Sequence, residues 1–224
     1  MALKGISPFA TFLIVGPVCF FLGILFASFP YDYYVLWTNP PALADSPLTD
    51  PREPFFAAQE AHLKFLHASP PLISRMLHIV IGTGLAGLMM KLYKPSEANM
   101  LFDGASLALY MIGVTVYIAN IVKGMRTVTA GAYGGEPIIE GEKLIARAFE
   151  GHEGEYIGRE DSLRVLSASN TILALVLVGV LVLQAGQWYA QRKEAEEIEQ
   201  MDKADSEKKD KKTAAGGSGG KKKQ

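Results

Sequence analysis

Four long apolar runs, separated by polar stretches rich in Pro or Gly, dominate the pattern of the chain. They cover about residues 9–29, 72–92, 104–122 and 165–189. Each run is continuously apolar rather than alternating, and its length is close to the roughly 20 residues that a helix needs to cross a bilayer. Helices satisfy their own backbone hydrogen bonds inside lipid, so the pattern predicts four transmembrane helices. The predicted fold class is an all-α membrane protein, a four-transmembrane-helix bundle with a disordered basic C-terminal tail.

The second run is less uniform than the others, because Arg75 and His78 lie in its first two turns. An arginine near a helix end can extend its charged group to the lipid headgroups, which removes most of the cost of inserting it. The second run is therefore also predicted to span.

The connections and the tail define the rest of the organisation. Residues 1–190 form the predicted tetraspan domain, and residues 191–224 form a charged, largely disordered tail that begins with a helical extension to about Asp202. The Pro-rich first connection contains a predicted short helix from Phe55 to Ala68, which would lie at the membrane interface. The Gly-rich third connection, 123–164, is predicted to be a mobile surface loop with one possible helix from Gly141 to Phe149.

Topology follows from the number of spans and from the distribution of basic residues. An even number of spans places both termini on one side of the membrane, and that side carries 13 of the 22 Lys and Arg residues. The positive-inside rule then predicts that both termini are cytosolic. Six of the other nine basic residues lie in the third connection, which weakens the asymmetry.

Catalytic, metal and cofactor sites are not expected. His62 and His67 are five residues apart, which does not place two ligands on one helix face, and the single cysteine, Cys19, excludes a disulfide framework. A formal net charge of -1 argues against nucleic acid as a partner. Asp32, His78 and Asp103 lie near span ends, so a membrane-embedded lipid-modifying enzyme remains an alternative.

Small and polar residues within the spans form the candidate client-binding or helix-packing face. Small residues recur four positions apart, and this spacing lets membrane helices approach closely. Polar side chains within a span are costly against lipid, so we expect them to face a helix, either of this chain or of a partner. The candidate residues are Gly82, Ala86, Gly113, Asn120, Ser167 and Thr171.

The last four residues, Lys221-Lys222-Lys223-Gln224, follow a Gly-rich tether. A basic tail near a membrane also binds anionic lipids, so membrane lipids are expected partners. Because Lys221 and Lys222 lie fourth and third from the carboxyl end, we interpret them as a candidate signal for retrieval to the endoplasmic reticulum (ER).

Taken together, several motifs resemble the fungal ER packaging chaperones for amino-acid permeases. They are FPYDYYVLW at 29–37, MLHIV at 76–80, KLYKP at 91–95, SLALYMIGVTVYIANI at 106–121 and VGVLVLQAGQWYA at 178–190. The resemblance implies an ER membrane protein with four spans and both termini cytosolic. It also implies a chaperone that keeps new permeases from aggregating and assists their loading into COPII vesicles. Permeases and COPII coat components are then the expected partners, and the terminal lysines would bind coatomer. A constitutive subunit of a transporter or secretory complex is a further alternative.

Overall fold

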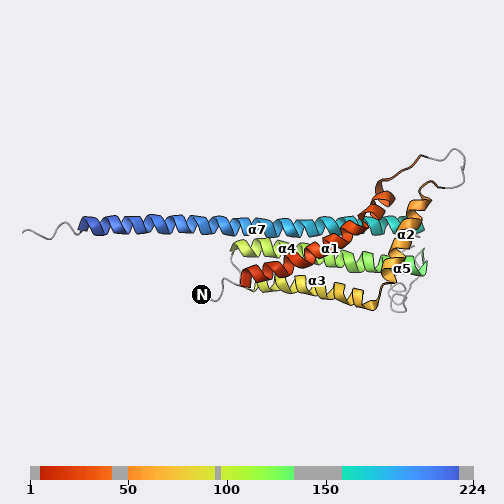
Figure 1. Cartoon of the computed structure of the whole chain (residues 1–224), viewed down its shortest axis with the longest axis horizontal. Helices are drawn as coiled ribbons and strands as arrows, with labels where there is room; N and C mark the ends of the chain where they lie inside the picture. Colours follow the sequence, from red (N-terminus) through yellow and green to blue (C-terminus); the bar gives the residue numbers. More distant parts are fainter. Residues whose placement is uncertain (1–5, 42–49, 94–96, 134–157, 217–224) are drawn as a thin grey trace, which may run out of the picture.

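The computed structural model describes residues 6–41, 50–93, 97–133 and 158–216, and these residues form helices and no strands. The helices are α1 (Ile6–Trp37), α2 (Glu53–His67), α3 (Pro71–Leu92), α4 (Glu97–Val116), the π-helix η1 (Tyr117–Val122), α5 (Lys123–Ala130) and α7 (Arg159–Gly216). Figure 1 shows an elongated bundle from which the last part of α7 projects. We name the end that carries α2 the α2 end, and the end from which α7 projects the tail end.

Four of the helical segments are long and apolar enough to cross a membrane, which confirms the predicted fold class. They are Pro8–Trp37, Pro71–Leu92, Met100–Ala130 and Arg159–Glu207, and each contains one predicted run. Both α1 and α4 pack closely against α3 and α7, whereas the backbones of α1 and α4, and those of α3 and α7, do not approach each other closely. The spans therefore form a ring in the order α1, α3, α4, α7.

The first span is longer than predicted, because α1 continues through Pro30 to Trp37. Proline within a helix removes one backbone hydrogen bond, and membrane helices tolerate this loss. The extension places the aromatic FPYDYYVLW segment on a helix rather than in a loop. Phe29, Tyr33 and Trp37 contact one another by their rings on one side of α1, and Asp32 is 1% exposed.

The third span is also longer than predicted, because α4, η1 and α5 follow one another without a break. The six residues of η1 have the wider π-helical backbone, which inserts an extra residue into a turn. The helix ends at Gly131, whose φ of 64° is the left-handed conformation that a glycine adopts without strain.

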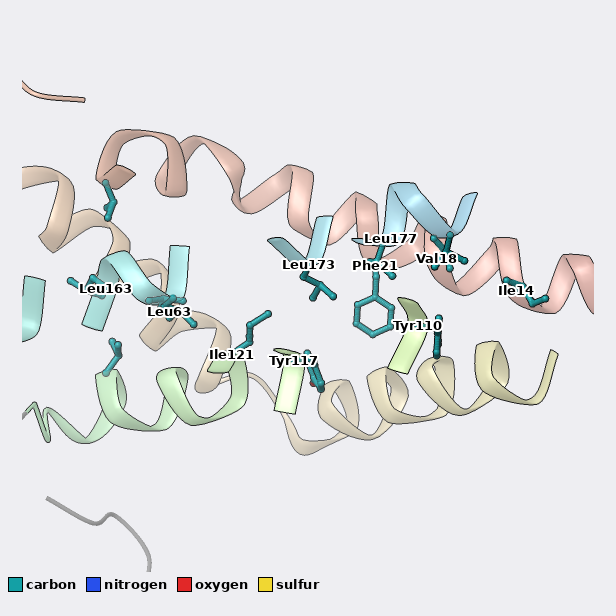
Figure 2. Packing of buried hydrophobic residues seen from close by; sticks show 14 of the residues in the cluster. Ile14, Val18, Phe21, Leu63, Tyr110, Tyr117, Ile121, Leu163, Leu173 and Leu177 are labelled. Carbon is teal, nitrogen blue, oxygen red and sulfur yellow. The ribbon is translucent and has the colours of Figure 1, made fainter. Parts of the chain in front are cut away.

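The core of the bundle is an apolar column along its axis. Figure 2 shows Val18 and Phe21 of α1 near Leu173 and Leu177 of α7 and the tyrosines of the third span, with Ile14 farther along α1. The rings of Phe21 and Tyr117 meet edge to face at 6.1 Å. These contacts join the two diagonal helices α1 and η1 through their side chains.

Outside the ring, α2 crosses the end of the bundle and contacts α1, α5 and α7 (Figure 1). It matches the predicted short helix, and it buries Phe56, Gln59 and Leu63, which lie three and four residues apart on one face. The possible helix at 141–149 lies outside the described residues.

The helical extension of α7 reaches Gly216, beyond the predicted end near Asp202. The segment consists mainly of Ala, Glu, Gln and Lys, which favour helix, and it has ion pairs four residues apart. Arg192 pairs with Glu196 at 3.2 Å, and Lys203 pairs with Glu199 at 2.6 Å. Residues 192–207 are all exposed, so local preferences rather than packing support this helix.

Candidate functional site

The structure divides the predicted site residues into an outward-facing group and an inward-facing group. Gly82, Ala86 and Asn120 are exposed on the outside of the bundle, whereas Gly113 and Ser167 are buried. Thr171 is partly buried and its hydroxyl donates to the Ser167 carbonyl at 3.2 Å. The six residues therefore do not form one continuous face.

On α3, the glycines that pack the bundle are not the predicted ones. A Cβ added at Gly82 would meet nothing within 4 Å, whereas one at Gly84 would collide with the ring of Tyr110. A Cβ at Gly87 would lie 2.9 Å from Leu13 Cβ of α1. Close packing of α3 thus uses Gly84 and Gly87, and the Gly82–Ala86 pair points away from the bundle.

The small residues of α1 show the same orientation. Cys19, Gly23 and Ala27, which are four residues apart, are all exposed, and a Cβ at Gly23 would have open space around it. In contrast, Gly113 packs against α7, where an added Cβ would lie 3.2 Å from Leu173 Cδ1. The small-residue rows of α1 and α3 are therefore available to another helix, while Gly113 has a packing role.

Asn120 lies in η1 and is exposed, so it does not face another helix of the described residues. Its side-chain amide has no hydrogen-bond partner among the described residues. A neutral amide on the outer surface of a span favours contact with a polar group of another membrane helix over contact with lipid. A partner helix would supply the contact that the bundle does not.

A buried polar cluster, the α2-end cluster, joins α1, α2 and α7. Its members are Asp32, Gln59, Ser167 and Asn170, each at most 9% exposed. Gln59 Nε2 donates to Asp32 Oδ1 at 2.8 Å and to Ser167 Oγ at 3.1 Å, and Asn170 Nδ2 donates to Asp32 Oδ2 at 3.1 Å. Of this cluster, Ser167 was predicted for the client-binding or helix-packing face, and Asp32 was considered for the alternative of a lipid-modifying enzyme.

A second buried cluster, the tail-end cluster, joins α3, α4 and α7. Lys91 Nζ lies 3.3 Å from Asp103 Oδ1, and both side chains are at most 6% exposed. The same Nζ donates to Gln184 Oε1 at 2.7 Å and to Gln187 Oε1 at 2.6 Å. Sequence reasoning placed Lys91 in a loop motif and missed this cluster, which becomes visible only when three helices are assembled.

Along α7, Asn170 of the α2-end cluster and Gln187 of the tail-end cluster are 17 residues apart. At about 1.5 Å per helical residue, this segment is roughly 25 Å long, close to the thickness of the hydrocarbon core. The segment contains no charged residue. The clusters therefore lie near the two boundaries of the apolar part of the bundle.

Ion pairs hold α2 onto the start of α7. Arg159 pairs with Glu53 at 2.9 Å and with Glu60 at 2.7 Å, and Arg52 pairs with Glu160 at 3.0 Å. Burial would raise the pKa of Glu60, but its hydrogen bonds to Lys64 and Arg159 outweigh that effect and lower it.

His62 provides a further contact between α2 and α1. Its ring stacks on Tyr31 at a centroid distance of 4.1 Å, and its Nε2 lies 3.3 Å from Ser28 Oγ. Burial lowers the pKa of His62 below its ordinary value of 6.5, so the docked helix favours the neutral imidazole.

Among the described residues, the structure does not pair Asp32 with His78, two residues considered for a lipid-modifying enzyme. Asp32 is enclosed in the α2-end cluster, whereas His78 is exposed on α3, where its Nδ1 lies 2.6 Å from the Ser74 carbonyl oxygen. In the described parts of the chain, no three His, Cys, Asp or Glu side chains are arranged to hold a metal ion. Lys221 and Lys222 lie outside the described residues.

Comparisons with known proteins agree with a membrane protein. A family model described as ER membrane protein SH3, of the SHR3 chaperone type, matches residues 5–223. The chain is 22% identical over 209 residues to the secretory component protein psh3 of Schizosaccharomyces pombe, covering 90% of this chain and 82% of that protein. No solved structure matches.

Proposed function

Because the chain belongs to the SHR3 chaperone family of ER membrane proteins, we propose that it prevents aggregation of newly made amino-acid permeases and assists their packaging into COPII vesicles. The family consists of chaperones and secretory components rather than enzymes. An ER membrane chaperone of the secretory pathway needs a surface that recognises unassembled membrane helices. The proposal identifies permeases as its clients.

The observation that supports this proposal is the presence of small and polar residues on the outer, lipid-facing surface of the spans. Gly82 and Ala86 on α3 and Asn120 on η1 face away from the bundle. Helices within a membrane associate through close packing at small residues and through hydrogen bonds, because lipid removes the hydrophobic driving force.

A newly inserted permease fits such a surface. Transporter helices are often broken by Gly or Pro and carry polar groups that are satisfied only after the helices have assembled. Weak contacts at Gly82 and Asn120 would cover these groups without competing with the final fold. Client release would then follow from folding of the permease itself.

Topology and retrieval complete the proposal. Both termini would be cytosolic, so that α7 projects toward the COPII coat components and the terminal Lys221 and Lys222 are accessible to coatomer. The basic tail would also contact anionic lipids. This arrangement would return the chaperone to the ER after its clients have left.

The experiment is to delete the gene and to follow several amino-acid permeases together with an unrelated multi-span protein, by fluorescence and native-gel mobility. Accumulation and aggregation of the permeases alone in the ER is the expected result. Arrest of all cargo, or of none, would contradict a dedicated permease chaperone.

The same strain separates the two alternatives. A lipid-modifying enzyme would show turnover that is lost on changing Asp32 or His78 alone, whereas a constitutive subunit would co-purify stoichiometrically with its partner at steady state. The separation of Asp32 from His78 gives no support to the first alternative, and transient association with permeases would exclude the second.

A further inference from the structure

The α2-end and tail-end clusters are built from the same chemical groups. In the tail-end cluster, Gln184 Nε2 donates to Asp103 Oδ1 at 3.2 Å and to Ser106 Oγ at 3.0 Å, and Gln187 Nε2 donates to Asp103 Oδ2 at 2.6 Å. The α2-end cluster likewise has one aspartate that accepts from two amides, and one serine that accepts from one of them. Each cluster is therefore a buried carboxylate within a shell of amide groups.

The clusters differ in how the negative charge and the amide oxygens are satisfied. Lys91 compensates Asp103 and donates to the oxygens of Gln184 and Gln187. At the other end, the ion pairs of the described residues include none with Asp32, and the buried Gln59 Oε1 has no hydrogen-bond partner. The α2-end cluster thus keeps a carboxylate without a cationic partner and an amide oxygen without a donor. In the tail-end cluster, the ammonium group of Lys91 satisfies both kinds of acceptor.

We propose that the α2-end cluster is a binding site for a basic side chain, Lys or Arg, near the end of a client membrane helix. Its cationic group would pair with Asp32 and donate to Gln59 Oε1, as Lys91 does with the equivalent groups. This inference rests on the proposed chaperone function and names the chemistry that one site on the chaperone recognises.

A membrane helix is a suitable source for such a group. The predicted topology places the α2 end on the lumenal side, where basic residues are less frequent than on the cytosolic side. A basic side chain that does lie at this bilayer boundary has no counter-charge before assembly, so a specific site for it is of use. The α2-end cluster lies at one boundary of the apolar part of the bundle, which is the depth of such a residue.

Entry of the basic side chain requires movement of α2, because Asp32 and Gln59 are each 1% exposed. The helix α2 is not one of the spans, and the pairs of Arg159 with Glu53 and of Arg52 with Glu160 join side chains that are 27–49% exposed. Exposed ion pairs contribute little individually, so displacement of α2 by a competing cation is physically accessible.

The test uses the full-length protein in nanodiscs and synthetic transmembrane peptides of Leu and Ala, about 20 residues long. One peptide carries a single Lys near one end, and matched peptides carry Gln or Leu at that position. We expect the Lys peptide to bind about tenfold more tightly or better, since a buried charge pair is commonly worth that much. Equal binding of the Lys and Gln peptides would overturn the proposal.

Variants assign the preference to the site. Asp32→Asn and Gln59→Leu should each reduce the preference for the Lys peptide, while Asp50→Asn, which changes an exposed carboxylate at the same end, should leave it intact. Gln59→Lys places a cation beside Asp32 within the chain, and should abolish the preference without lowering the unfolding temperature. A preference that persists in Gln59→Lys would overturn the proposal even if Asp32→Asn does not fold.

Two further measurements distinguish the proposed site from a metal-ion site and from a site that plays no part in permease export. In the first, Na⁺, K⁺ or Ca²⁺ is added at constant ionic strength. If the ion raises the unfolding temperature of the wild-type protein but not of Asp32→Asn, and also suppresses peptide binding, the site takes a metal cation instead of a basic side chain. If Asp32→Asn loses the peptide preference but still exports permeases normally, client recognition through this site is wrong while the chaperone function stands.

Discussion

The contrast between Gly87 and Gly82 gives the sharpest structural prediction. A Cβ at Gly87 would lie 2.9 Å from Leu13 Cβ, 3.0 Å from the Ala10 carbonyl oxygen and 3.0 Å from Ile14 Cγ1. Carbon atoms pack at about 3.5–4.0 Å, so Gly87→Ala must move α1 and α3 apart by roughly 0.6 Å. The Ala10 oxygen is a backbone atom and cannot rotate away, which leaves helix displacement as the main relief.

The expected cost of Gly87→Ala is that of overpacking a tight interface, about 1–3 kcal/mol. For a chain of this size, the loss corresponds to a fall of roughly 2–12 °C in the unfolding midpoint. Gly82→Ala adds the same methyl group to the same helix, but an added Cβ there meets nothing within 4 Å, so we expect no loss.

The assay is thermal unfolding of both variants in mild detergent, followed by size-exclusion chromatography with fluorescence detection. Circular dichroism of α-helix content provides the control for correct insertion. A Gly87→Ala midpoint equal to that of the wild type, or an equal fall in Gly82→Ala, would refute the assignment of inner and outer faces on α3.

Four other predictions concern the spans, the docking of α2 and the tail. Gly82→Leu should keep the wild-type unfolding midpoint but reduce permease export. Gly113→Leu should reduce export through lower chaperone abundance, because the added side chain meets Leu173. Immunoblots of the chaperone alongside permease localisation distinguish these two causes. Lys91→Met should destabilise the protein by about 3–5 kcal/mol, because it leaves the Asp103 carboxylate buried without its counter-charge, and adding Asp103→Leu should recover much of the midpoint. Because the folded-state pKa of His62 is lowered, its contribution to α2 docking is present above pH 6.5 and is lost as the pH falls below it. The protection factors of the α2 amides, which are corrected for the intrinsic pH dependence of exchange, should therefore fall from pH 7.5 to 5.5, and His62→Gln should flatten that change. Replacing Lys221 and Lys222 by Ser should move the protein to the Golgi, and unchanged ER residence would show that the spans retain it.

The four spans could be predicted from sequence because each run is largely apolar over a membrane thickness. Their ends were less predictable. The first run was predicted to end near residue 29, yet α1 continues to Trp37. The enclosed Asp32 and the aromatic contacts of Phe29 and Trp37 support the extra turns. Such tertiary contacts have no signature in a single sequence.

The candidate site shows the same limit. The spacing of Gly82 and Ala86 predicted a small-residue face, but spacing alone does not say toward which side of the bundle that face points. The packing positions Gly84 and Gly87 lie three apart on the same helix, so the two faces differ only by rotation about the α3 axis. Likewise, the pairing of Lys91 with Asp103 depends on where α3 ends beside α4, which is fixed only in the assembled bundle.

The central claim is that the outward-facing spans contact newly made permeases, and site-specific photo-crosslinking tests it directly. A photoreactive residue at Gly82 or Asn120 is compared with one at Leu175, an apolar position on α7 that is 67% exposed. Cross-links from Gly82 and Asn120 to permeases during synthesis, decaying as the permeases leave the ER, are the predicted result. Equal cross-linking from all three positions, or permeases captured only from Leu175, would contradict the assignment of the client-binding surface.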